Sequence, residues 1–261
     1  MTTQSIHVVN GLLVRRSGPP NAPKLLCLHG FGDSGSMFQP LTETSLVDEH
    51  ELVMVDLPGF GASPPRPGLS GIDDYGALVA ELAAAIAPRE PVGLIGHSIA
   101  SPIAVAAIGQ LEPAPFGIFS IEGNLTEDDA YFTGQAADWD GAEPFKASFL
   151  DKIGEMSRTN DDLRRYYGLV TTADASVLWH LGRDARRASR GDALGHAYRA
   201  LDVPHLYFWS EATTPERTRD FLTTHAIPNR RYAAASHWPT VVDPTASADA
   251  IRDFFADSIP R

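Results

Sequence analysis

The feature that most constrains the fold is a turn of small residues between two apolar segments. Residues 91–96 form a short apolar run, residues 99–111 form a nearly all-apolar helical stretch, and Gly96-His97-Ser98-Ile99-Ala100 joins them. A sharp turn from a strand into a helix needs small residues two before and two after its centre, because its backbone is strained and larger side chains would clash. The sequence therefore predicts a buried strand, a tight turn that exposes the Ser98 hydroxyl, and a buried helix.

Strand and helix patterns alternate on both sides of this turn. Such alternation predicts an α/β fold, with a mostly parallel sheet covered by helices on both faces. Asn10-Gly11 is a strong signal for a hairpin near the N-terminus. The expected strands are 7–9, 12–14, 24–28, 51–56, 91–96, 116–121, 204–209 and 230–235. The expected helices of this part are 72–88, 99–111, one near 215–226 and one that starts at Pro244 after an Asp243 N-cap.

The alternation stops between residues about 125 and 201. This part has helical stretches at 143–156, 161–169, 175–181 and 193–201, and no convincing strand. We therefore expect one core domain made of residues 1–124 and 202–261, with a helical cap of residues 125–201 inserted in it. A chain of 261 residues that is 43% hydrophobic is long enough to bury one large core.

Composition excludes several classes of protein. A formal net charge of -12 would repel a phosphate backbone, so no nucleic-acid partner is expected. The one cysteine, Cys27, allows no internal disulfide, and no Cys/His cluster has zinc-ligand spacing, so neither a metal nor a cofactor is expected. No apolar run approaches the length of a membrane span, and the N-terminus lacks the apolar segment of a signal peptide. We expect a soluble cytoplasmic protein without a membrane partner, and the oligomeric state stays open.

A base for Ser98 is expected, because a serine hydroxyl is a weak nucleophile until its proton is removed. His237 is the best placed of nine histidines, in a loop between the last expected strand and the last expected helix. His97 is too close to Ser98 in sequence to reach its hydroxyl and is expected to pack beside the turn. His29 is expected to be structural.

Four motifs in this order resemble the α/β-hydrolase superfamily. They are His29-Gly30-Phe31-Gly32, Asp56-Leu57-Pro58-Gly59-Phe60-Gly61-Ala62-Ser63, Gly96-His97-Ser98 and Ser236-His237-Trp238-Pro239. The resemblance covers nearly the whole chain except the cap. It implies an α/β-hydrolase fold with a nucleophile elbow at Ser98 and His237 as its base. It also implies an oxyanion hole made by the backbone N–H groups of Phe31 and Ile99.

The acid of the triad departs from the common family pattern. Members usually carry an aspartate shortly after the next-to-last strand, where this chain has Ser210-Glu211-Ala212-Thr213, with Thr213 in the expected place. A histidine base needs a carboxylate that fixes its tautomer and stabilises the imidazolium. Some members, including haloalkane dehalogenases and zearalenone-type lactone hydrolases, carry the acid at the end of the strand after the elbow helix, which is Glu122 here. The resemblance favours Glu122, with Glu211 and Glu216 as alternatives.

A serine nucleophile argues against dehalogenases and epoxide hydrolases, whose nucleophile is aspartate. It fits a hydrolase that cleaves a small, largely apolar carboxylic ester or lactone through an acyl-enzyme intermediate. A C–C bond hydrolase of the same fold and a non-catalytic ligand-binding protein are the alternatives. Pockets for such substrates are mainly apolar, and Trp139, Trp179 and Trp238 are the candidate substrate-binding residues.

Overall fold

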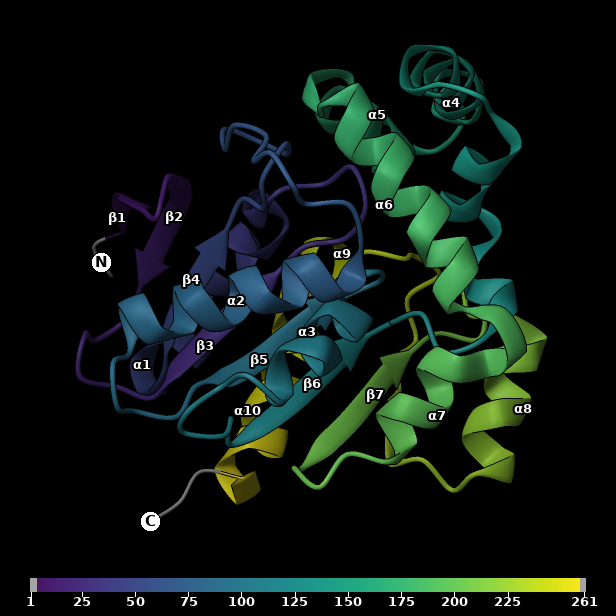
Figure 1. Cartoon of the computed structure of the whole chain (residues 1–261). Coiled ribbons are helices and arrows are strands. Elements are labelled where there is room, and N and C mark those ends of the chain that lie inside the picture. The colour runs from purple at the N-terminus through teal and green to yellow at the C-terminus, as the bar shows by residue number, and fades with distance from the viewer. Residues whose placement is uncertain (1–3, 259–261) are drawn as a thin grey trace.

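The computed structural model describes residues 4–258 and is built around one eight-stranded sheet (Figure 1). The strands lie in the order β1-β2-β4-β3-β5-β6-β7-β8. The β1–β2 and β2–β4 pairs are antiparallel, and every other pair is parallel, which confirms the predicted mostly parallel α/β sheet. The strands are β1 (Ser5–Val9), β2 (Leu12–Ser17), β3 (Lys24–Leu28), β4 (Glu51–Val55), β5 (Gly93–His97), β6 (Gly117–Ile121), β7 (His205–Trp209) and β8 (Asn229–Arg231).

The four central strands β3 to β6 are buried along their whole length. Helices on both faces produce this burial, and they explain why these strands are continuous apolar runs rather than alternating ones. Figure 1 shows α2 (Ile72–Ile86) and α3 (Ala100–Ile108) in front of the sheet and α10 (Pro244–Ser258) behind it. The other helices of this part are η1 (Gly35–Glu43), α1 (Leu46–Glu49), α8 (Glu216–Thr224) and α9 (Pro239–Val242).

The end of the sheet differs from the prediction in one strand. The strand expected at 230–235 is the shorter β8, which ends at Arg231. Tyr232 still donates its N–H to Trp209 O at 2.9 Å, but its side chain turns inward and the chain leaves the sheet edge. This departure carries the following loop across the carboxyl ends of the strands. The predicted start of α10 is confirmed, because Asp243 accepts a hydrogen bond from the Ala246 N–H at 3.1 Å.

The elements between β6 and β7 are helices, and we call residues 125–201 the cap. In Figure 1 its helices α4, α5 and α6 lie beyond the carboxyl ends of the strands. None of the helices within residues 4–258 is long and apolar enough to cross a bilayer. The cap helices are η2 (Glu127–Tyr131), η3 (Thr133–Asp138), α4 (Ala142–Met156), α5 (Asp161–Thr172), α6 (Ala175–Ala188), η4 (Arg190–Asp192) and α7 (Ala193–Arg199).

The turn from β5 into α3 explains why its residues are small. A Cβ atom at Gly96 would lie 2.8 Å from both the Ala100 carbonyl oxygen and the Ser101 Cα. Both neighbours belong to the first turn of α3, so the helix could not follow the strand so closely with a larger residue at this position. Gly109, at the other end of α3, has no atom within 4 Å of the corresponding point.

We expect Gly96→Ala to lower the free energy of unfolding by about 1–3 kcal/mol, because the added methyl group overlaps backbone atoms that are held in the core. Gly109→Ala is the matched control on the same helix. It should change stability by no more than about 1 kcal/mol, and in the stabilising direction. Urea unfolding of both variants measures the difference, and equal stabilities would contradict the packing argument.

Candidate active site

Ser98 lies at the centre of the turn, with its backbone in the left-handed region at φ 54°. L-residues with side chains adopt this conformation rarely, and it is stable here because the turn is held on both sides. The Ser98 N–H donates to Ile121 O at 2.9 Å, and the Ser98 carbonyl accepts from the Ser101 N–H at 3.0 Å. The turn therefore presents the hydroxyl at the carboxyl end of the sheet, where it lines a cavity.

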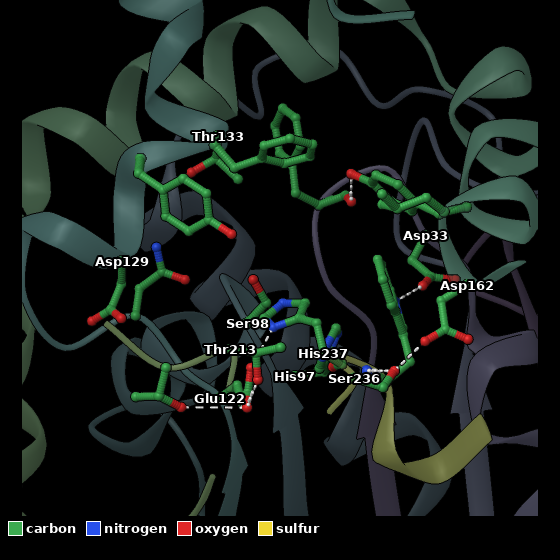
Figure 2. A pocket seen from close by; sticks show the side chains of 18 of the residues that line it. Asp33, His97, Ser98, Glu122, Asp129, Thr133, Asp162, Thr213, Ser236 and His237 are labelled. Atoms are coloured by element: carbon green, nitrogen blue, oxygen red, sulfur yellow. Dashed lines mark hydrogen bonds and ion pairs between the residues drawn. The ribbon is translucent and has the colours of Figure 1, made fainter. Parts of the chain in front are cut away.

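His237 and Glu122 come together beside Ser98 (Figure 2). Glu122 follows β6, His237 lies in the loop between β8 and α9, and His237 Nδ1 is 2.6 Å from Glu122 Oε2. Figure 2 shows the His237 ring between Ser98 above it and Glu122 below it. The two other candidate acids lie away from this group. Glu211 is an exposed side chain that pairs with Arg231 at 2.7 Å, and Glu216 lies in the first turn of α8.

Glu122 is a buried carboxylate surrounded by hydrogen-bond donors. Burial raises its pKa, but the hydrogen bonds from His237, Thr213 and Tyr232 outweigh burial and hold the pKa below its usual range. The carboxylate is therefore ionised and oriented at neutral pH. Its Oε1 accepts hydrogen bonds from the Ser210 N–H (3.0 Å), Thr213 Oγ1 (2.5 Å), Thr214 Oγ1 (3.3 Å) and the Tyr232 hydroxyl (2.6 Å).

Thr213 stands where the common family pattern places the aspartate, and its hydroxyl donates to Glu122. This position therefore carries no carboxylate, and its side chain contacts the carboxylate that follows the neighbouring strand β6. The sequence shows the missing aspartate but gives no signal that the threonine contacts the replacement, because 91 residues separate the two.

His97 fixes the backbone of His237. Its Nε2 donates to the His237 carbonyl oxygen at 2.8 Å, and the two rings lie 4.6 Å apart. Burial lowers the pKa of His97 well below its ordinary value, and the nearby His237 lowers it further. His97 therefore stays neutral with its proton on Nε2, and it packs beside the turn as expected.

Two backbone N–H groups, one in the loop after β3 and one in the Ser98 turn, have no acceptor among the described residues. Within residues 4–258, neither the Phe31 N–H nor the Ile99 N–H has a hydrogen-bond acceptor. The loop is held by His29, whose Nδ1 donates to Gly30 O at 2.8 Å and whose Nε2 accepts from the Leu57 N–H at 2.9 Å. Burial lowers the pKa of His29, which keeps it neutral for this structural role.

The cap helix α5 is tied to the core around the same loop. The buried Asp33 accepts two hydrogen bonds from Arg165, at 2.9 and 3.2 Å, and a third from the Trp238 indole N–H at 2.8 Å. The Tyr166 hydroxyl donates to Phe31 O at 2.6 Å. These contacts join the cap to the loop after β3 and, through Asp33, to the residue that follows His237. Sequence reasoning missed them because Arg165 lies 132 residues from Asp33 and no local pattern relates the two.

A cavity of about 340 Å³ lies between the cap and the carboxyl ends of the strands, with Ser98 in its wall. Trp238, one of the three predicted substrate-binding residues, lines it. Trp139 and Trp179 lie outside the lining, which corrects that part of the prediction. The Trp179 indole N–H donates to Trp139 O at 3.0 Å, and the Arg183 guanidinium lies 4.5 Å from the Trp179 ring centre, so these rings pack with the cap itself.

The described part of the chain contains no group of three His, Cys, Asp or Glu side chains close enough to hold a metal ion.

The profile of the alpha/beta hydrolase family matches residues 25–250 of this chain. The chain belongs to the alpha/beta hydrolase family. The sheet order, the covering helices and the turn at Ser98 are those of the α/β-hydrolase fold, which confirms the predicted fold class.

Two solved structures share this fold over nearly the whole chain. A thermophilic esterase from Thermogutta terrifontis has 17% sequence identity and a TM-score of 0.72, over 98% of this chain and 99% of that one. An enol-lactonase from Burkholderia xenovorans LB400 has 18% identity and a TM-score of 0.74, over 97% and 100% of the two chains.

A sequence relative is the "Biotin biosynthesis bifunctional protein BioHC" of Teredinibacter turnerae. It is 26% identical over 272 aligned positions, which cover 93% of this chain and 46% of the relative. This chain thus spans less than half the length of that bifunctional protein.

We expect Glu122→Gln to lower kcat/KM for an activated ester by about 10³–10⁴-fold, because an amide can hold the His237 ring in the wrong tautomer. Glu211→Gln is the matched control, and its rate should stay within a few-fold of the unsubstituted protein. Steady-state kinetics measures both rates, and the thermal midpoint shows whether each variant is folded. A folded Glu122→Gln protein with an unchanged rate would exclude Glu122 as the acid.

Proposed function

We propose that this protein hydrolyses carboxylic esters or lactones through an acyl-enzyme intermediate on Ser98. The observation that carries the proposal is the series Glu122, His237 and Ser98 at one end of the sheet, beside two backbone N–H groups without an acceptor within residues 4–258. Nucleophilic acyl transfer needs a serine, a histidine that takes the serine proton, and a buried carboxylate that orients the histidine.

Each residue has one role in the proposed reaction. His237 removes the Ser98 proton as Oγ attacks the substrate carbonyl, and Glu122 accepts the hydrogen bond from Nδ1–H of the resulting imidazolium. The Phe31 and Ile99 N–H groups donate to the oxyanion that forms on the carbonyl oxygen. His237 then protonates the leaving alcohol. Water, activated by the same histidine, attacks the acyl-enzyme and releases the acid with Ser98 restored.

The lining of the cavity favours an ester or lactone of largely apolar character. Apolar and aromatic side chains of both the cap and the core line it together with polar groups, a combination that is common for small-molecule sites. The esterase and the enol-lactonase with the same fold act on bonds of this kind according to their names. The apolar and aromatic lining residues are Phe31, Tyr131, Phe132, Met156, Leu163, Tyr166, Tyr207, Pro215, Ala235 and Trp238.

The cap of residues 125–201 has the role of a lid in this proposal. It supplies about half of the apolar wall, including Phe132, Met156 and Leu163, so we propose that it determines which acyl or alcohol group binds, whereas the core performs the chemistry. A lactone substrate is the narrower form of the proposal, since the strand-end position of Glu122 resembles that of zearalenone-type lactone hydrolases. We propose a cytoplasmic enzyme that acts on a free small molecule.

We expect a fluorophosphonate probe to modify the protein at Ser98, because the activated hydroxyl attacks the phosphorus as it would attack a carbonyl carbon. Ser98→Ala should remain folded, should not be modified, and should lose about 10⁶-fold in kcat for p-nitrophenyl esters. Peptide mass spectrometry locates the modified residue. Modification elsewhere, or a rate unchanged by Ser98→Ala, would refute the proposal, and a protein that neither reacts nor turns over any ester would be a ligand-binding member of the family.

A further inference from the structure

His237 lies on a loop and not on a helix or strand. Residues 233–238 belong to neither kind of element, so strand pairing does not fix this segment. Groups that perform chemistry have to be held within about 0.5 Å of their productive positions, and on a loop the surrounding side chains have to supply this precision. The contacts of the residues on either side of His237 therefore decide how well the base is placed.

The Ser236 hydroxyl links this loop to the cap (Figure 2). It donates to Asp162 Oδ2 at 2.5 Å and accepts from the Trp238 N–H at 3.1 Å. One oxygen thus connects the residue before His237, the residue after it and the first turn of α5, in which Asp162 lies. Ser236 is 6% exposed, so little water competes with Asp162 for its proton. The N-terminus of a helix is also a favourable place for a carboxylate.

Two further residues on the same face of α5 fix this helix against the core. Arg165 and Tyr166 follow Asp162 by three and four positions, a spacing that places side chains on one face of a helix. Arg165 binds Asp33, and the Tyr166 hydroxyl donates to the Phe31 carbonyl. Burial raises the pKa of Tyr166 well above its ordinary value, so the hydroxyl keeps the proton that it donates. Asp162 is therefore presented to Ser236 by a helix that is itself held in place.

The close approach of α5 also explains a glycine in the loop after β3. Gly32 has a φ of 69°, and a Cβ atom there would lie 2.7 Å from Val170 Cγ2 and 2.9 Å from the Tyr166 hydroxyl oxygen. A larger residue would push α5 away from the loop, in a backbone conformation that favours glycine. The sequence of this loop is thus suited to a cap that stays docked.

We infer that Asp162 is a positioning residue for His237 and that it acts through the Ser236 hydroxyl. The inference rests on the proposed ester or lactone hydrolysis and extends the role of the cap, because α5 then sets the rate of the chemistry as well as the choice of substrate. Without the contact, the loop around His237 loses its direct tie to the cap. The rate falls even with an ester too small to reach the apolar side chains of the cap, since a displacement of about 1 Å can cost about 10²-fold.

The test is a double-mutant cycle on Asp162 and Ser236, measured with p-nitrophenyl acetate. Asp162→Ala and Ser236→Ala should each lower kcat by about 10- to 100-fold and leave KM within about threefold. In the Ser236→Ala protein, Asp162→Ala should change kcat by no more than about twofold, because the hydroxyl through which Asp162 acts is gone. Losses that multiply in the double variant would overturn the inference, as would an unchanged kcat in Asp162→Ala.

Two variants of the first turn of α5 separate positioning from folding. Asp162→Asn keeps an oxygen that accepts from Ser236, and its kcat should stay within about threefold of the unsubstituted protein. Asp161→Ala is the matched control, because it removes a neighbouring carboxylate that is 88% exposed and pairs with Arg164 at 2.6 Å. Its kcat should not change. Thermal midpoints show which variants are folded, and if Asp162→Ala is not, an unchanged kcat in Ser236→Ala overturns the inference.

Longer esters distinguish positioning from substrate contact, since Asp162 also lines the cavity. A positioning residue lowers kcat for p-nitrophenyl acetate and heptanoate by the same factor, within about twofold. A loss that appears in KM and grows with chain length would identify Asp162 as a substrate contact and overturn the inference.

The outcomes also separate this inference from the proposed function. Turnover of p-nitrophenyl acetate that depends on Ser98 but not on Asp162 or Ser236 would refute the positioning role and leave the proposed function intact. Absence of turnover with every ester, together with absence of modification by the fluorophosphonate probe, would refute both.

Discussion

The hydrogen bond between His237 Nδ1 and Glu122 Oε2, 2.6 Å long, is the contact on which the organisation of the site depends. Burial of a carboxylate is unfavourable unless donors replace the lost water, and Glu122 satisfies this condition with donors from three segments that meet at one end of the sheet. The loop after β7 supplies Ser210, Thr213 and Thr214, the residue after β8 is Tyr232, and the loop before α9 supplies His237. The position of the Glu122 carboxylate therefore depends on the packing of the C-terminal half of the sheet.

The cap is coupled to the same group of residues through its helix α5. Asp33 binds Arg165 of the cap and Trp238, the residue after His237, while Tyr166 holds the carbonyl of Phe31. The Ser236 hydroxyl, on the other side of His237, donates to Asp162 at the start of α5 at 2.5 Å. The segment around His237 and the loop that contains Phe31 are thus both held by the helix that covers the cavity. Movement of α5 would loosen the arrangement around His237 and uncover the cavity at the same time.

The sequence predicts the fold well because its signals are local. The turn around Ser98, the apolar strands and the Asp243 N-cap each depend on neighbours in the chain, and each is present in the structure. The contact between Glu122 and His237 could be predicted only from the family resemblance. The five residues that donate hydrogen bonds to the Glu122 carboxylate lie about 90 to 115 residues away in the sequence, so no local pattern indicates them. Trp139 and Trp179 show what residue type alone does not predict, which is the direction in which a side chain points. Their aromatic character suggested substrate contact, but orientation within a helical cap is decided by long-range packing that residue type does not specify.

The most direct test of the account is the tautomer of His237, measured by nitrogen NMR on protein with isotope-labelled histidine. The geometry predicts that the neutral ring carries its proton on Nδ1, donated to Glu122, with Nε2 bare toward Ser98. In Glu122→Gln the single tautomer should give way to a mixture, while the His97 signals keep the proton on Nε2. A neutral His237 with its proton on Nε2 in the unsubstituted protein would contradict the assignment of Glu122 as the acid and of His237 as the base.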